Sequence, residues 1–252
     1  MSKKQNKKFE IDLFDDVANI FLKDREFTDQ IIHNYLSPAI TPIANLFRGR
    51  LLECGCGVGY FGKFFLKQFK DLMVTGVDIS SRMLHLAHDP KEKYTAITAD
   101  LENKKIFSNN TFNVALCPGV LHHFPDIDTV FKNITFWLDK NGILIIIEPN
   151  GSSPVNWASK LLRDFISVFL GEDWVFRKKL ATPNETDHSI STYMNYLKSY
   201  DYEILVYKTM IFRSAPAWNL LTVKQLLYWF IFLFTKGTKF GGSSVLIIAQ
   251  KR

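Results

Sequence analysis

The sequence feature that most constrains the fold is a short apolar run that leads directly into closely spaced glycines. Residues 51–62 have the sequence LLECGCGVGYFG, with glycines at positions 55, 57 and 59 after the apolar run. A strand that ends in a glycine-rich turn and opens a helix lets a ligand approach the backbone closely, because no Cβ stands in the way. The segment therefore predicts a strand–turn–helix unit of a nucleotide-binding α/β sheet.

Apolar runs and helical stretches alternate along this part of the chain. Strands are predicted at residues 50–54, 72–78, 94–99, 112–117 and 142–148, and helices at residues 59–69, 80–88 and 127–138. Near-continuous apolar strands that alternate with helices indicate a parallel sheet buried on both faces. Two later runs, at residues 202–207 and 244–250, are predicted to close the sheet.

The glycine spacing is compatible with two classes of cofactor. Gly57, Gly59 and Gly62 match the pattern GxGxxG of dinucleotide-binding sites, in which a pyrophosphate lies on the helix N-terminus. Glu53 ends the strand just before the glycines, however, and its carboxylate suits a cationic ligand group better than a diphosphate. An NAD(P)-dependent oxidoreductase is therefore the alternative, although the chain has no recognisable Tyr-x-x-x-Lys dyad.

Two further acids follow predicted strands. Asp78 closes the second strand, where a carboxylate can accept hydrogen bonds from a ribose diol, as in NAD and other nucleoside cofactors. Asp100 directly follows the third strand, where it can accept from an exocyclic adenine amine. The NAD pattern does not demand this third acid.

Taken in order, these segments resemble the class I S-adenosylmethionine-dependent methyltransferases, and more narrowly the subgroup that acts on small molecules and lipids. The resemblance is carried by residues 53–59, 76–80, 99–101, 112–124 and 141–149. Five motifs in order, each on its expected element, are far more specific than any one of them. The resemblance implies a Rossmann-like α/β fold with helices on both faces of a seven-stranded, mostly parallel sheet whose last strand is antiparallel.

The resemblance also implies the cofactor S-adenosyl-L-methionine and the residues that bind it. These residues are Glu53, Gly55, Gly57, Gly59, Asp78, Ile79, Asp100, Leu101 and Cys117. At the methionine end, Glu53 is expected to hold the ammonium group through water, and the backbone near Cys117 to accept from it. At the adenosine end, Asp78 is expected to bind the ribose hydroxyls and Asp100 the adenine amine. Ile79 is expected to pack on the adenine, and the Leu101 N–H to reach a ring nitrogen.

Two adjacent histidines, His122 and His123, follow the fourth strand at the cofactor edge of the sheet. Because a sulfonium methyl is already activated, catalysis mainly requires in-line placement of the acceptor, and a base helps when the nucleophile carries a proton. Either histidine is a candidate base, and packing or loop orientation is the alternative role. His188 is a second candidate base or a helix-start residue, and Glu148 either contacts substrate or simply ends the fifth strand.

The sequence predicts no metal site and no exported protein. Cys54 and Cys56 are separated by one residue and have no nearby third ligand, so they do not form a closed zinc site. With Cys117 they make three cysteines, too few for a disulfide framework, which favours a reducing compartment and hence the cytoplasm. The N-terminus shows no signal peptide.

Charge and apolarity differ between the two halves of the chain. Residues 9–150 hold 14 Lys and Arg against 18 Asp and Glu, which argues against a nucleic-acid partner, whereas residues 151–252 hold 13 against 7. In the second half an apolar helix is predicted to begin at Leu220 and end at Phe234. It is expected to pack on the sheet or on a second copy in a homodimer, to cover an apolar substrate pocket, or to lie peripherally in a membrane interface.

The chain length of 252 residues suits one large α/β domain. Residues 1–8 are predicted to be a disordered basic tail and residues 9–252 a single domain. Within it, residues 9–48 are predicted to be a helical cap, and residues 151–200 and 214–240 to be insertions on the substrate side. The predicted function is methyl transfer to a small, apolar or lipid-like acceptor, and a non-catalytic S-adenosylmethionine-binding domain is the other alternative.

Overall fold

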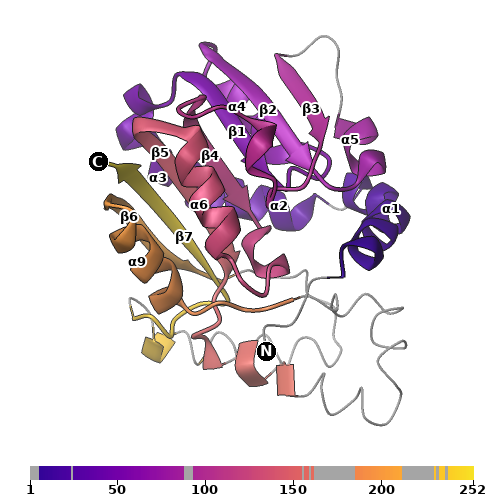
Figure 1. Cartoon of the computed structure of the whole chain (residues 1–252). Coiled ribbons are helices and arrows are strands. Elements are labelled where there is room, and N and C mark those ends of the chain that lie inside the picture. Colours follow the sequence, from indigo (N-terminus) through magenta and orange to yellow (C-terminus); the bar gives the residue numbers. More distant parts are fainter. Residues whose placement is uncertain are drawn as a thin grey trace.

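Seven strands form an open sheet with helices on both faces (Figure 1). The structure is a computed structural model, and it describes residues 6–23, 25–87, 93–154, 156–158, 160–161, 185–211, 230, 233–235 and 238–252. The strand order is β3-β2-β1-β4-β5-β7-β6. The strands are β1 (Gly49–Cys54), β2 (Leu72–Asp78), β3 (Tyr94–Thr98), β4 (Phe112–Pro118), β5 (Leu138–Pro149), β6 (Tyr202–Met210) and β7 (Ser244–Lys251).

The helices precede, follow or connect these strands. The α-helices are α1 (Lys7–Lys23), α2 (Glu26–Ile31), α3 (Ser37–Ile40), α4 (Tyr60–Gln68), α5 (Ser81–Ala87), α6 (Asp128–Trp137) and α9 (Ile190–Ser199). The structure also has the π-helical turn η1 (Ile32–Leu36) and the 3-10 turns η2 (Thr41–Leu46), η3 (Lys104–Ile106) and η4 (Leu121–His123).

The direction of the strands confirms the predicted fold class. β1 pairs in parallel with both β2 and β4, and β4 pairs in parallel with β5. β7 is antiparallel to β5 on one side and to β6 on the other. From β1 the chain first forms β2 and β3 on one side of β1 and then crosses over to form β4 on the other side. In open α/β sheets, ligands bind in the crevice at the carboxyl ends of strands at such a switch point.

Both faces of the sheet are buried, which explains the near-continuous apolar runs. On β1, Leu51 packs in a cluster with Phe65 of α4, whereas its neighbour Leu52 packs in a second cluster with Phe131 of α6. Successive side chains of a strand point to opposite faces, so each strand supplies both clusters. Because both faces of β1 are buried, β1 does not show the alternation of apolar and polar residues that is typical of a half-exposed strand.

Local capping follows the sequence signals. The side-chain oxygen of Ser80 accepts a hydrogen bond from the backbone N–H of Met83 at 3.1 Å and so caps the start of α5. Between α9 and β6, Asp201 has a φ of 57°. Aspartate is among the few residues other than glycine that tolerate the left-handed conformation.

Several element boundaries differ from the expected ones. α1 begins at Lys7, before the expected end of the basic tail, and β5 begins at Leu138 rather than residue 142. Leu138 pairs with Phe112, and the register then shifts before Ile143 pairs with Val114; a left-handed Asn141, with a φ of 63°, lies within this irregular part of β5. Residues 1–5, residues 162–184 of the predicted insertion at 151–200, and most of the helix predicted over 220–234 lie outside the described residues.

Candidate active site

A cavity of about 460 Å³ opens at the carboxyl ends of β1, β2 and β4, and α1 and α2 contribute to its wall. The predicted site residues that line it are Gly55, Gly57, Asp78, Ile79, Asp100, Leu101, His122 and His123. Glu53, Gly59 and Cys117 were also predicted and are not among the lining residues. The structure thus brings most of the predicted residues from four separate segments into one space.

The glycine-rich turn has the backbone shape that its sequence suggested. Gly55, Gly57 and Gly59 have φ values of 60°, 51° and 78°, in the left-handed region that other residues rarely adopt. A Cβ built at Gly57 would meet no atom within 4 Å, because this residue faces open cavity. The turn therefore offers backbone to a ligand at Gly57, whereas Gly59 serves to start α4.

Asp78 holds the turn and lines the cavity at the same time. Its Oδ2 accepts from the N–H of Gly57 at 2.8 Å, and its Oδ1 accepts from the N–H of Ser80 at 2.9 Å. Burial raises the pKa of Asp78, although these two backbone hydrogen bonds oppose the rise. Each carboxylate oxygen has a further lone pair, so ribose hydroxyls can be accepted without breaking the turn.

Asp100 lies at the neighbouring strand end and is contacted by the N-terminal helix. Its Oδ1 accepts from the N–H of Glu102 at 3.0 Å. Its Oδ2 accepts a charged hydrogen bond from Lys7, the first residue of α1, which also contacts the Glu102 carboxylate. Asp100 therefore faces the cavity with one oxygen already paired to a cation.

Glu53 lies beneath the glycine turn rather than on the cavity wall. Its side chain is 0% exposed, and its Oε2 accepts from the Tyr94 hydroxyl at 2.7 Å. A Cβ at Gly62 would come within 2.4 Å of the same oxygen, so only glycine leaves room for this carboxyl. Oε1 has no hydrogen-bond partner among the described residues. Burial raises the pKa of Glu53 to about 7, although the hydrogen bonds from Tyr94 and the Gly62 backbone act to lower this pKa.

This carboxyl makes folding depend on pH. Between the ordinary glutamate pKa of 4.5 and the folded pKa of about 7, the folded state binds more protons than the unfolded state. The contribution of Glu53 to stability is therefore complete below the lower pKa and falls by about 3 kcal/mol as the pH rises through the upper one. In urea unfolding, we expect Glu53→Gln to exceed the wild type in stability at pH 8 and to match it at pH 4.5. A wild type that is the more stable of the two at pH 8 would contradict this account.

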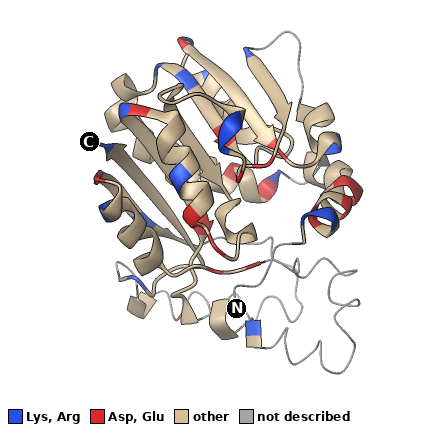
Figure 2. Cartoon of the chain, viewed as in Figure 1, with Lys and Arg blue, Asp and Glu red and all other residues tan. Residues whose placement is uncertain are grey.

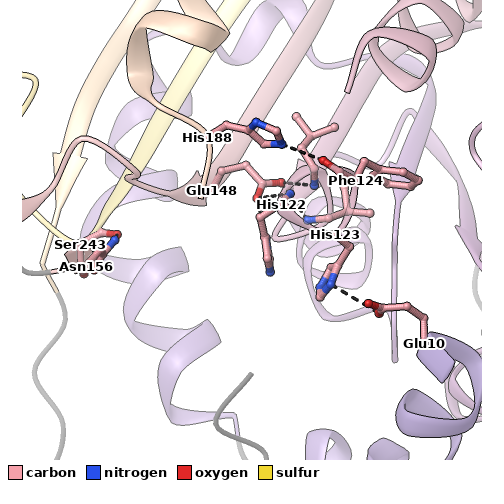
Figure 3. Close-up of polar contacts among 10 residues, drawn as sticks. Glu10, His122, His123, Phe124, Glu148, Asn156, His188 and Ser243 are labelled. Atoms are coloured by element: carbon pink, nitrogen blue, oxygen red, sulfur yellow. Dashed lines mark hydrogen bonds and ion pairs between the residues drawn. The ribbon is translucent and has the colours of Figure 1, made fainter. Parts of the chain in front are cut away.

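His122, which is partly exposed, and the buried Glu148 form a pair at the edge of the cavity (Figure 3). The Oε1 of Glu148 accepts from the N–H groups of Val120 and Leu121 at 2.8 and 2.7 Å, and its Oε2 lies 2.8 Å from the Nδ1 of His122. Burial alone would lower the pKa of His122, but the hydrogen bond and charge of Glu148 raise it overall. An ionised Glu148 accepts only, so Nδ1 carries a proton and Nε2 is the ring nitrogen left for other contacts.

His123 contacts the N-terminal helix instead. Its Nδ1 lies 3.5 Å from the Oε2 of Glu10, and its ring meets that of Phe14 edge-on at 5.2 Å between centroids. The rings of His122 and His123 are 4.1 Å apart. His188 is buried, and its Nε2 lies 2.8 Å from the carbonyl of Phe124, outside the cavity lining. Its position just before the Ser189 cap of α9 fits the helix-start role.

The sequence did not reveal the contribution of α1 to this cavity. Lys7, Glu10 and Phe14 touch the site from this helix, and no motif marks them. One signal was present: Glu10 precedes Leu13 and Val17 by three and seven residues, so it is an acid on the apolar face of a predicted helix. The described residues contain no group of three side chains suited to a metal ion, and the three cysteines are buried free thiols.

Residues 52–144 match a protein family described as a methyltransferase domain. Among curated proteins, the malonyl-[acyl-carrier protein] O-methyltransferase of Legionella pneumophila is 27% identical over 99 residues. The aligned part is 38% of this chain and only 34% of that protein. The matched region includes Glu53, the glycine turn and both strand-end acids, and it gives the oxidoreductase alternative no support.

Solved structures share the fold over most of the chain. One is a geranyl diphosphate C-methyltransferase from Streptomyces coelicolor, solved in complex with geranyl diphosphate and S-adenosyl-L-homocysteine. Its TM-score is 0.59 at 14% sequence identity, and the match covers 86% of this chain and 79% of that chain. An S-adenosylmethionine-dependent methyltransferase from Mesorhizobium loti has a TM-score of 0.54 at 17% identity, covering 84% and 98%. These structures share the fold of the chain, and the family match adds a methyltransferase domain at residues 52–144. The family recognised from the motifs is confirmed, and S-adenosylmethionine is its cofactor.

Proposed function

We propose that this protein transfers a methyl group from S-adenosylmethionine to a small, largely apolar acceptor, with His122 as the base. The observation that carries the proposal is the convergence of the open turn at Gly57, the acids Asp78 and Asp100, and the His122–Glu148 pair on one cavity. When bound, the cofactor supplies a methyl group already activated as a sulfonium. The protein's task is to orient the acceptor and to remove its proton.

The cofactor residues fit this group by their chemistry. Asp78 and Asp100 present carboxylate oxygens to the cavity, which suits a ribose diol and an adenine amine. Because Gly57 has no side chain, an atom of the cofactor can lie directly against its backbone. Glu53 lies below the turn with an unpaired Oε1, so we assign it a contact with the cofactor ammonium through water. Ile79 and Leu101 are assigned to the adenine, and the backbone near Cys117 to the methionine end.

The lining of the cavity favours an apolar acceptor. It includes Phe14 and Phe21 of α1, Phe27 of α2 and Phe61 of α4. Aromatic walls with a few convergent polar groups are typical of sites for small apolar molecules. The names of the related enzymes also point to small or carrier-bound acceptors, namely malonyl-acyl carrier protein and geranyl diphosphate.

His122 is expected to give the reaction a defined pH profile. The base must be neutral at Nε2 to accept a proton, and its pKa is raised above the ordinary 6.5. We therefore expect the rate of methyl transfer to rise with pH through a pKa above 6.5 and then to level off. His122→Asn should lower kcat by about 10²–10⁴-fold and remove this limb. The assay follows release of S-adenosylhomocysteine across a library of small apolar hydroxyl and amine compounds, and an unchanged profile in the variant would exclude His122 as the base.

The proposal includes a cytoplasmic protein without a nucleic-acid partner. In the view of Figure 2, the described Lys and Arg residues are scattered rather than gathered in one patch, which favours a small-molecule partner. Among the described helices, none combines the length and the apolarity that a membrane crossing requires. Peripheral membrane contact and homodimer formation were predicted for residues 220–234, most of which lie outside the described part of the chain.

A further inference from the structure

One face of α1 closes the side of the cavity. Lys7, Glu10, Phe14, Val17 and Phe21 follow one another at intervals of three or four residues, so they lie on the same face of this helix. Glu10, Phe14 and Phe21 line the cavity, and α1 lies beside α5 at the cofactor edge of the sheet (Figure 1). The helix thus presents a polar and aromatic surface to the ligand space.

The same face reaches both ends of the proposed site. At the adenosine end, Lys7 pairs with Asp100. At the acceptor end, Glu10 is only 2% exposed, and its carboxylate lies 3.5 Å from the Nδ1 of His123 (Figure 3). The His123 ring in turn lies against His122 at 4.1 Å. A continuous set of contacts therefore runs from α1 to the proposed base.

The apolar cluster that attaches α1 to the rest of the domain is small compared with the two clusters of the sheet. Its buried apolar residues Val17 and Ala18 pack in a cluster with Val58 and Met83, separate from the two large clusters of the sheet. Other contacts of α1 are the edge-on packing of Phe14 on His123 and the hydrogen bond from the Ser80 hydroxyl to Asp15. Segments held by few buried apolar contacts open at a low free energy compared with global unfolding.

We propose that α1 is a lid over the cofactor and acceptor cavity and that Glu10 is its positioning residue, acting through His123. In the closed lid, Glu10 pairs with His123 and thereby fixes the loop that carries His122. Because one rigid helix also holds Lys7 at Asp100, a bound cofactor and a closed acceptor end stabilise the same position of α1. This inference rests on the proposed function and adds to it a route by which cofactor binding assembles the acceptor site.

A purely structural role for Glu10 predicts something different. A buried ion pair often contributes little net stability, because desolvation offsets its attraction. If Glu10 served only to dock α1, its replacement would change the unfolding free energy without a specific effect on a bound ligand. If it is the residue that secures a lid, its replacement must speed the escape of the ligand from the cavity.

The test measures S-adenosylhomocysteine on the full chain in two ways. Stopped-flow displacement gives its dissociation rate, and hydrogen exchange of residues 7–23 with and without the ligand reports closure of α1. The variants are Glu10→Gln, His123→Gln and the double variant, with Asp16→Asn as the matched control because Asp16 is an exposed acid of the same helix. Glu10→Gln keeps the size of the side chain, so the fold is expected to survive.

We expect Glu10→Gln to release the ligand about tenfold faster and to lose the ligand-dependent protection of α1, while Asp16→Asn behaves as wild type. The double variant should release it no faster than the faster single variant, because both changes remove the same contact. Wild-type release from Glu10→Gln, or effects that simply add, would overturn the role of Glu10. A wild-type protein that does not bind S-adenosylhomocysteine would instead overturn the proposed function, so the two failures are distinguishable.

Discussion

Asp78→Ala is expected to remove nearly all stabilisation of the protein by S-adenosylhomocysteine. The wild type at 100 times the dissociation constant should gain about 2.7 kcal/mol, a rise in Tm of about 5–10 °C for a domain of this size. The variant loses the acceptor for two ribose hydroxyls, and hydrogen bonds to a charged group are worth about 1.5–3 kcal/mol each. At the same ligand concentration the expected shift is then close to zero. The measurement is thermal unfolding with and without the ligand.

The controls separate binding from folding, because Asp78 also holds the glycine turn. Its two oxygens accept from Gly57 and Ser80, so the ligand-free variant should itself melt at a lower temperature than wild type. Asp78→Asn keeps one acceptor oxygen for the turn and should show a smaller loss of ligand-free stability. Asp71→Ala removes an exposed carboxylate just before the same strand and should respond to the ligand as wild type. A full ligand shift in Asp78→Ala would contradict the ribose role.

The second large effect is expected at Glu148. In Glu148→Ala, the N–H groups of Val120 and Leu121 and the Nδ1–H of His122 lose their acceptor inside the protein. A buried donor left without an acceptor typically costs about 1–3 kcal/mol, so the loss of three such contacts should lower the free energy of unfolding by at least about 3 kcal/mol. Urea unfolding measures it, and Lys140→Ala, at an exposed position of the same strand, is the control and should stay within about 0.5 kcal/mol of wild type.

Glu148→Gln separates the structural role of this residue from its effect on the base. The glutamine oxygen can still accept from Val120 and Leu121, so most of the stability should survive. Its amide would donate to Nδ1 of His122, which moves the ring proton to Nε2 and leaves no acceptor facing the substrate. We therefore expect near-normal unfolding and S-adenosylhomocysteine binding, with methyl transfer reduced as far as in His122→Asn. Retained activity in a well-folded Glu148→Gln would show that Glu148 does not set the tautomer of His122.

Local and periodic features of the sequence predicted the sheet and most of the cofactor edge. Strand ends are placed by short apolar runs, so Asp78 and Asp100 could be assigned to one edge once the strands were recognised as parallel. The spacing of the glycines was sufficient to predict the turn in which they adopt left-handed conformations. The start of β5 was missed because Asn141 adopts a left-handed conformation inside the strand, and the residues before it have no apolar pattern.

The partners of the buried polar groups could not be predicted in the same way. Tyr94 meets Glu53 across two strand pairings, and Glu10 meets His123 only because α1 docks beside the β4 loop. Such contacts depend on three-dimensional packing between segments distant in the sequence, and no local propensity encodes them. For the same reason Glu148 could be noted as a strand-end acid, while its role as the acceptor for the His122 loop required the structure.

The central claim is that adenosine lies between two strand-end acids beside the glycine turn, and a crystal structure of the chain with S-adenosylhomocysteine tests it most directly. The account predicts ribose hydroxyls on Asp78, the adenine amine on Asp100 and the amino-acid end along Gly57. Electron density for the ligand at any other place, with this cavity filled by solvent alone, would contradict it.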